Sequence, residues 1–215
     1  MPLEAKTRKR IEHLLLAADD RGIRGPRLLD DARRLWKQVD HWVARHLVSP
    51  DCDRPALELA CYALQLPLKE KSIPCVGRYG QVNLRERAEQ AAEGLLSELT
   101  DASDEALLDR TTELLHDVPS RKPARDEARL LADVINLDDF GVTGAVRQTL
   151  LLALMGQGLD QLLEASDKRD AYGYWEARLK DGFHFGPTRE AARRRLARAR
   201  QFIELLRDET REHDD

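Results

Sequence analysis

The most constraining feature of this sequence is the spacing of its apolar residues, which recur three and four positions apart along most of the chain. This spacing places apolar side chains on one face of an α-helix, whereas a half-buried strand needs alternation with a period of two. Hydrophobic residues make up 42% and charged residues 34% of the 215 positions, a balance that excludes an intrinsically disordered chain. The sequence therefore predicts an all-α protein, built as a compact bundle of many helices.

Prolines, glycines and capping residues divide this pattern into separate helices. Asp53 is the expected N-cap of the third helix, Pro55 lies in its first turn, and Pro67 ends it. A loop is expected over 69–81, because this stretch contains Pro74, Gly77 and Gly80. Helices are expected at about 4–19, 28–48, 55–66, 84–99, 104–115, 126–136, 142–155, 160–165, 172–180 and 188–209. We expect an N-terminal helix and linker over 1–26, one helical domain over 27–210 and an acidic tail over 211–215.

The net charge of −4 argues against a protein whose general task is binding nucleic acid or anionic membranes, since such proteins usually carry a basic excess. The basic start of the chain is followed by residues 11–18, which Glu12 and His13 interrupt, so a signal peptide is not expected. The longest apolar run, 149–155, is far shorter than the roughly 18 residues of a membrane span. We therefore expect a cytoplasmic protein that does not bind membranes.

The last expected helix combines an apolar stripe with many arginines. The stripe should pack against the rest of the domain, and it consists of Ala192, Leu196, Ala199, Ile203 and Leu206. The arginines could bind phosphate backbones, but acidic residues such as Glu190 and Glu204 lie three or four positions from several of them. A solvated face with ion pairs along the helix is the favoured interpretation, and nucleic-acid binding is the alternative.

One segment resembles a known family. Residues 127–141, EARLLADVINLDDFG, resemble the late motif of the HD-domain superfamily of metal-dependent phosphohydrolases, usually E-x-x-L-L-x-D-A-D-x-L-D-x-x-G. Residues 174–179, 188–191 and 197–209 look like the C-terminal end of the small single-domain bacterial members. Residues 59–67 fall where this family has L-A-A-L-L-H-D-I-G, and 35–39 where it has H-x-x-R-V. The resemblance covers about 27–210 and implies an HD-domain-like fold.

The resemblance also locates the family's metal ligands, which are an early histidine, an adjacent His-Asp pair and a later aspartate. Together they hold a divalent cation that polarises a phosphoryl oxygen and generates a bound hydroxide. In this chain these ligands fall on Leu35, Leu64, Gln65 and Ile135. None of the four residues binds a metal as the family's ligands do, and burying the aliphatic ones is favourable by roughly 1.5–3 kcal/mol each. We therefore expect a degenerate HD fold with no metal or other cofactor.

A second register stays open as an alternative. Leu114-Leu115-His116-Asp117-Val118 matches the family's L-L-H-D-[IV] pattern, although no histidine lies between His46 and His116 to serve as its partner. In this register His116 and Asp117 would be ligands of a divalent metal. The chain would then be an active phosphohydrolase that acts on nucleotide-like phosphate esters.

A final group of residues lies near the place where the family's substrate entrance is expected. Arg78, Arg121 and Lys122, with Asp133 in the late motif, form a candidate anion- or ligand-binding set. Asp133 more readily serves as a cap or a structural hydrogen-bond partner. The sequence thus predicts a non-enzymatic HD-like pseudoenzyme that binds a small phosphorylated ligand or a protein partner.

Overall fold

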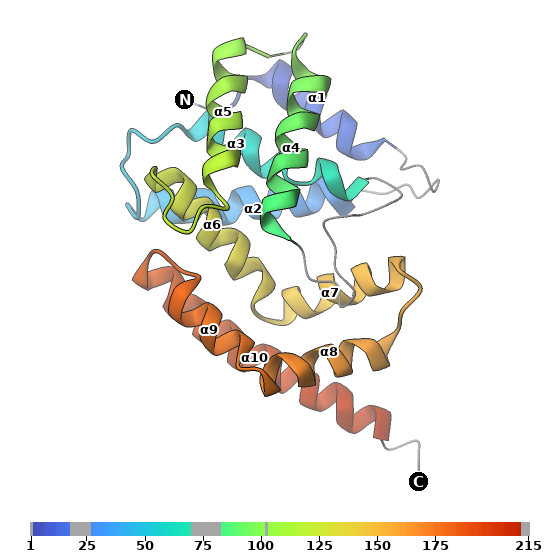
Figure 1. The fold of residues 1–215 in the computed structure, drawn as a ribbon. Coiled ribbons are helices and arrows are strands. Elements are labelled where there is room, and N and C mark those ends of the chain that lie inside the picture. Colours follow the sequence, from blue (N-terminus) through green and yellow to red (C-terminus); the bar gives the residue numbers. More distant parts are fainter. Residues whose placement is uncertain (1, 18–26, 70–82, 102, 212–215) are drawn as a thin grey trace. The chain divides into compact units, whose positions relative to one another are not determined.

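A computed structural model describes residues 2–17, 27–69, 83–101 and 103–211. Within these ranges the chain forms ten α-helices and one 3-10 helix and contains no strand, so the prediction of an all-α protein is confirmed (Figure 1). The elements are α1 (Ala5–Leu16), α2 (Arg27–Ala44), α3 (Arg54–Ala63), η1 (Leu66–Lys69), α4 (Leu84–Leu99), α5 (Glu105–Asp117), α6 (Asp126–Asp139), α7 (Val142–Leu154), α8 (Leu159–Ala171), α9 (Tyr174–Asp181) and α10 (Gly186–Arg211).

The helices belong to two compact units, which we describe separately. The N-terminal unit comprises Met1–Cys75 and Val82–Ala132, and the C-terminal unit comprises Val76–Gln81 and Asp133–Asp215. Helix α6 passes from the first unit into the second between Ala132 and Asp133. The expected division into 1–26, 27–210 and 211–215 stays a prediction.

Helix α3 forms the centre of the N-terminal unit, where it contacts α1, α2, α4 and α5. Every residue from Ala56 to Ala63 is buried, including the carboxylate of Glu58. Arg8 pairs with Glu58 at 2.6 Å, so the negative charge is compensated within the unit. The expected cap of α3 is confirmed, because the Asp53 carboxylate accepts a hydrogen bond from the Ala56 N–H at 3.0 Å.

The end of α3 differs from the expectation of a helix up to residue 66. The α-helix ends at Ala63, and after a two-residue turn the chain continues as the 3-10 helix η1 from Leu66. Pro67 explains the change, since a proline disfavours the α conformation of the residue before it and has no N–H to donate.

The C-terminal unit packs α7, α8, α9 and α10 around a small apolar core. Leu152, Leu162 and Ile203 form one buried cluster, one residue from each of α7, α8 and α10. A second contact joins aromatic rings, with Phe140 packed edge-on against Trp175 and Phe183 at centroid distances of 4.9 and 5.5 Å. The expected stripe on α10 contributes Ala192, Leu196 and Ile203 as buried residues, with Ala199 and Leu206 half-buried beside them.

Two glycines shape the junction between α6 and α7. Gly141 has a φ of 95° and a ψ of −179°, a conformation that is almost restricted to glycine. Gly144 lies so close to the end of α6 that a Cβ atom there would be 2.1 Å from the Asp139 carbonyl oxygen. The sharp connection therefore depends on both positions lacking a side chain.

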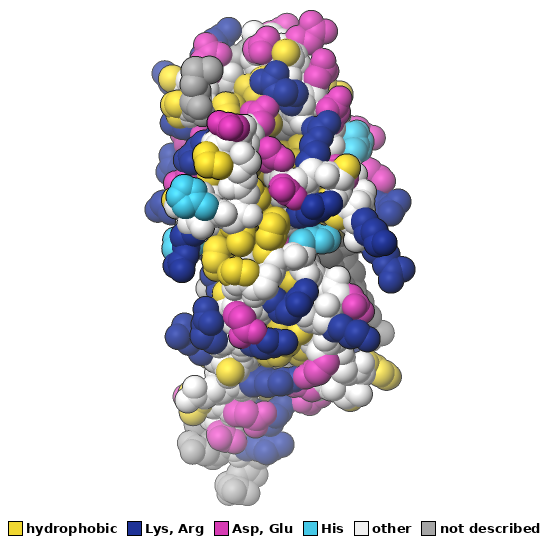
Figure 2. All heavy atoms as spheres, turned by 90° about the vertical axis from the view of Figure 1, so that its left-hand side faces the viewer, with side chains coloured by type: hydrophobic (Ala, Val, Ile, Leu, Met, Phe, Trp, Pro, Cys, Tyr) yellow, Lys and Arg dark blue, Asp and Glu magenta, His cyan; other side chains and the backbone are white. Residues whose placement is uncertain are grey.

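Opposite charges are interspersed on the face shown in Figure 2, where no large field of one sign develops. None of the helices in the described chain has the length and apolar character needed to cross a membrane.

Candidate functional site

The positions where the HD resemblance places metal ligands are core positions in this chain. In the N-terminal unit, Leu35 of α2 is 3% exposed, and Leu64 and Gln65 at the end of α3 are 0% and 1% exposed. In the C-terminal unit, Ile135 lies in α6 and is also buried. Each residue therefore fills its own unit's interior, and the assignment of these positions as former ligand sites stays a prediction.

A buried arginine occupies the end of α3. The Arg87 side chain extends from α4 and donates from Nε to the Leu64 carbonyl oxygen at 2.6 Å, although the residue is only 3% exposed. Its positive charge lies at the negative end of the α3 helix dipole, where a cation is favoured. A fixed guanidinium here satisfies a carbonyl of the last helical turn and repels any second cation.

Gln65 is next to this contact and is incompletely hydrogen-bonded. Its Nε2 donates to the Cys61 carbonyl at 3.4 Å, while Oε1 has no partner among the described residues. Burial raises the pKa of the Cys61 thiol, so this cysteine stays protonated rather than forming a thiolate. The end of α3 thus carries a neutral thiol, an amide and a guanidinium.

The alternative register places His116 and Asp117 in the last turn of α5. His116 is exposed, and the Asp117 carboxylate accepts hydrogen bonds from the N–H groups of Ala124 and Arg125, each at 3.0 Å. Both carboxylate oxygens are therefore used to fold the chain into α6. Across the ranges that the structure describes, no three His, Cys, Asp or Glu side chains gather in a way that could hold a metal ion.

The candidate anion-binding residues have different environments. Arg78 lies outside the described residues. Arg121 and Lys122 are exposed in the turn before α6, in the N-terminal unit. Asp133 is fully buried in the C-terminal unit, and the set as a whole stays a prediction.

The Asp133 carboxylate accepts hydrogen bonds from residues at the start of α10. One carboxylate oxygen accepts from the His184 N–H at 2.7 Å, and the other accepts from the Phe185 N–H at 2.9 Å and from the Thr188 hydroxyl. Burial raises the pKa of the Asp133 carboxyl, and the three hydrogen bonds oppose this effect. The geometry is that of a structural cap that ties α6 to the turn before α10.

One turn after Asp133, α6 presents a cluster of arginines, aromatic rings and polar side chains that the sequence analysis missed. Arg178 of α9 donates to Asn136, to the Tyr174 hydroxyl at 3.0 Å and to Asp139 at 3.1 Å. Its guanidinium also lies 5.4 Å from the centroids of the Phe140 and Tyr174 rings.

Two further arginines complete this cluster. Arg147 of α7 forms a largely buried ion pair with Asp138 at 2.6 Å. Arg169 of α8 lies 5.6 Å from the Tyr174 and Trp175 ring centroids, and burial lowers its pKa. We call this group the arginine–aromatic cluster; it consists of Asn136, Asp138, Asp139, Phe140, Arg147, Arg169, Tyr174, Trp175 and Arg178.

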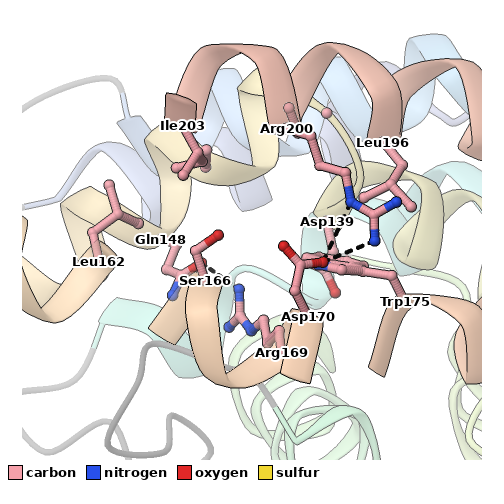
Figure 3. A pocket seen from close by; sticks show the side chains of 13 residues that line it. Asp139, Gln148, Leu162, Ser166, Arg169, Asp170, Trp175, Leu196, Arg200 and Ile203 are labelled. Atoms are coloured by element: carbon pink, nitrogen blue, oxygen red, sulfur yellow. Dashed lines mark hydrogen bonds and ion pairs between the residues drawn. The ribbon is translucent and has the colours of Figure 1, made fainter. Parts of the chain in front are cut away.

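A small pocket opens beside the cluster (Figure 3). Its walls come from the end of α6 and from α7, α8, α9 and α10, with Gln148 hydrogen-bonded to Arg169 on one side and Asp170 paired with Arg200 on another. The pocket measures about 40 Å³. Since one water needs roughly 10–15 Å³ measured in this way, the pocket holds a few water molecules and not a metabolite.

A second pocket lies in the N-terminal unit, where α3 and α6 begin beside α5. It measures about 150 Å³ and is lined by Asp53, Ala56, Arg110, Leu114, Arg125 and Glu127. Its charges are balanced by neighbouring pairs, because Arg110 donates to Asp53 at 2.6 Å and Arg125 pairs with Glu113. The charged groups that line the pocket therefore balance one another, and the pocket is about half as large as the roughly 300 Å³ of a small metabolite site.

Comparison with family models, with curated proteins and with solved structures finds no match to this chain.

The arginine–aromatic cluster could not have been found from spacing alone. Asn136 and Arg178 are 42 residues apart, and their contact depends on how α9 folds back along α6. The available signal was the pair Tyr174-Trp175 next to Arg178, which the HD resemblance treated as part of a terminal pattern. The cluster links helices of the C-terminal unit through paired charges and stacked rings, an arrangement suited to holding these helices in a fixed geometry.

Proposed function

We propose that this chain is a non-catalytic, HD-like helical protein that acts in the cytoplasm by binding a ligand or a protein partner. The observation that carries the proposal is the environment of Leu64 and Gln65 at the end of α3. Both side chains are buried, and the Leu64 carbonyl is bonded to the buried guanidinium of Arg87 at 2.6 Å. A divalent cation bound here would have to share a low-dielectric environment with this fixed positive charge, which is strongly unfavourable.

The choice between a ligand and a protein partner depends on size. The pockets of about 40 and 150 Å³ are smaller than the sites that enclose a nucleotide or a similar metabolite. Arg121 and Lys122 are exposed and form no ion pair with described residues, so they are available to contact a phosphate group at the surface. A macromolecular partner, or a phosphorylated group carried by one, fits these dimensions better than an enclosed small molecule.

Metal content and hydrolysis together test the proposal. We expect purified protein, incubated with manganese, iron or zinc and then desalted, to keep less than about a tenth of an equivalent of metal, because a site without a preformed set of ligands binds weakly. We also expect no hydrolysis of nucleotide monophosphates above the buffer rate. Elemental analysis and phosphate release measure the two quantities.

The substitution His116→Ala distinguishes the alternative register, and His41→Ala is its matched control, because His41 is also exposed near the end of a helix. Neither substitution should change metal content or phosphate release. One full equivalent of metal with hydrolysis that disappears in His116→Ala and survives in His41→Ala would refute the proposal and establish the active phosphohydrolase.

A further inference from the structure

The larger of the two pockets plays no part in the proposed function. We call it the α3–α6 pocket; it measures about 150 Å³ and is lined by Asp53, Ala56, Arg110, Leu114, Arg125 and Glu127. All of these residues belong to the N-terminal unit, so the pocket is formed within one unit. A cavity of about 150 Å³ holds a molecule of the size of benzene, which has six non-hydrogen atoms. The α3–α6 pocket therefore suits a ligand much smaller than a nucleotide.

Two arginines on its wall use only part of their hydrogen-bonding capacity. Arg110 donates through Nε to Asp53 at 2.6 Å, and Arg125 donates through one Nη atom to Glu113. Each guanidinium has five N–H groups in a planar fork. Within the described ranges, no acceptor is bonded to the other N–H groups of these two side chains. A carboxylate is the group that such a fork binds best, because it accepts two parallel hydrogen bonds.

Glu127 contributes the opposite charge. Its Oε1 atom accepts a hydrogen bond from the Asp53 N–H at 3.3 Å. Its Oε2 atom has no hydrogen-bond partner, and the carboxylate forms no ion pair, as far as the described residues extend. This carboxylate can therefore bind an ammonium group, which is a compact cation with three donors.

We propose that the α3–α6 pocket binds a small zwitterion, a molecule of about six non-hydrogen atoms that carries one carboxylate and one ammonium group. Free alanine has this size and this chemistry. Arg110 and Arg125 hold its carboxylate, and Glu127 holds its ammonium group. Its methyl group packs against the apolar part of the wall. The inference goes beyond the proposed function, because it uses neither the buried end of α3 nor the surface arginine and lysine before α6.

The lining charges favour this ligand over one with a single charge. Two arginines and two carboxylates line the pocket, so their formal charges cancel. A lone anion bound by the arginines would leave the Glu127 carboxylate unpaired beside it. A lone cation bound by Glu127 would leave the arginine N–H groups without an acceptor. In each case a charged group loses hydration that no hydrogen bond replaces, whereas a zwitterion satisfies both groups.

Chemical-shift titrations by two-dimensional NMR on the full chain test the proposal. L-alanine should give saturable shifts with a dissociation constant of roughly 0.1–1 mM, the range expected of so small a ligand. Propionate is alanine without its ammonium group, and ethylammonium is alanine without its carboxylate. Each of these two compounds should bind at least about tenfold more weakly than L-alanine, because each lacks one charge-assisted contact.

Substitutions separate the two ends of the ligand. Glu127→Gln keeps an acceptor for the Asp53 N–H but removes the charge, so it should weaken L-alanine at least about tenfold without weakening propionate. Arg110→Gln should weaken both ligands. Arg10→Gln is the matched control, since Arg10 is an almost equally exposed arginine that forms an ion pair with Glu98, and its replacement should leave both affinities unchanged.

The same spectra show whether each variant is folded. Because Arg110 also bonds to the N-cap of α3, Arg125→Gln repeats the test if Arg110→Gln does not fold. Absence of saturable shifts up to about 20 mM L-alanine overturns the inference. Propionate that binds as tightly as L-alanine also overturns it, since the pocket would then bind anions without regard to the ammonium group. A loss of affinity in Arg10→Gln as large as that in Arg110→Gln would place the ligand elsewhere and overturn it too.

Discussion

Asp133 is a buried carboxylate whose two oxygens accept three hydrogen bonds from residues 184–188. Burial disfavours the ionised form and raises the pKa of Asp133, whereas the three donors favour the ionised form. Burial has the larger effect on the pKa. At the scale of single residues, the hydrogen bonds at the start of α10 therefore depend on whether the Asp133 carboxyl is protonated.

The raised pKa of Asp133 predicts the sign of a pH effect on stability. Folding disfavours the ionised form, so the contribution of Asp133 to the free energy of unfolding is lowest above its raised pKa and increases as the pH falls toward the ordinary value of 3.8. Replacing Asp133 by Asn removes this titration. The difference in unfolding free energy between wild type and Asp133→Asn should thus grow in favour of the wild type as the pH falls from 7 toward 4.

Urea titrations at several pH values measure this difference. Asp133→Asn should also be less stable throughout, by about 1–3 kcal/mol, because the amide has one acceptor oxygen for donors that now use two. Thr188→Val is the informative companion, since it deletes a hydrogen bond that lowers the pKa of Asp133 and should move the same trend to higher pH. A difference that is constant from pH 4 to 7 would contradict the assignment.

At the scale of elements, the junction between α6 and α7 depends on a close backbone approach. A Cβ atom at Gly144 would lie 2.1 Å from the Asp139 carbonyl oxygen, far inside any allowed contact. Because that obstacle is backbone, it moves only if α6 and α7 separate. Gly144→Ala should therefore destabilise the protein by about 3 kcal/mol or more, at the upper end of what overpacking costs.

Gly94 provides the control for this prediction. It lies within α4, and a Cβ atom there would meet only the flexible Leu66 side chain, at 3.4 Å. Gly94→Ala should raise the free energy of unfolding by up to about 1 kcal/mol, since alanine restricts the unfolded chain and favours the helix. Thermal denaturation of both variants checks the opposite signs; equal and small effects would show that the junction tolerates a side chain.

The elements also show how far sequence patterns extend. Apolar periodicity located each of the ten helices found in the described residues, and Asp53 and Pro55 predicted the start of α3 correctly. Helix α8 was expected over 160–165, whereas it spans Leu159–Ala171. Its second half consists mostly of polar residues and was therefore not predicted as helix, yet Arg169 is packed on the rings of Tyr174 and Trp175. Periodicity counts such an arginine as solvent-facing, because the rings that cover it belong to the next helix.

The candidate site was less predictable for the same reason. The late motif drew attention to Asp133 as a cap or hydrogen-bond partner, but its donors lie more than fifty positions away. The partners of Arg178 on α6 lie 39 and 42 positions away. Local patterns determine which face of a helix is buried, whereas the choice of hydrogen-bond partner depends on tertiary packing.

At the scale of the whole molecule, charge is balanced and dispersed. The net charge is −4, and several arginines of α10 pair with acidic neighbours, among them Arg193 with Glu190 and Arg207 with Glu204. These pairs confirm the expectation of ion pairs along the last helix. A protein that held many phosphates would instead need arginines whose charge is available to the ligand.

This balance predicts that the chain does not bind duplex nucleic acid. In fluorescence anisotropy with a labelled duplex, we expect no binding below about 100 µM at 150 mM salt, a limit at the weak end of non-specific affinities. Arg194 and Arg198 are exposed on α10, so Arg194→Ala/Arg198→Ala should leave the signal unchanged. Binding that weakens steeply with salt and is lost in this double variant would restore the nucleic-acid alternative.

The cap at Asp133 also imposes an order on the folding of the protein during its synthesis. Its donors lie 51, 52 and 55 residues further along the chain. At roughly 5–20 residues per second, the ribosome delivers them about 3–11 s after Asp133 has been added. Until then no hydrogen bond of the protein replaces the hydration of the Asp133 carboxylate, so burial of the second half of α6 is unfavourable. Maturation of the C-terminal unit must therefore wait for the last helix to be translated, whereas the N-terminal unit already has all of its residues.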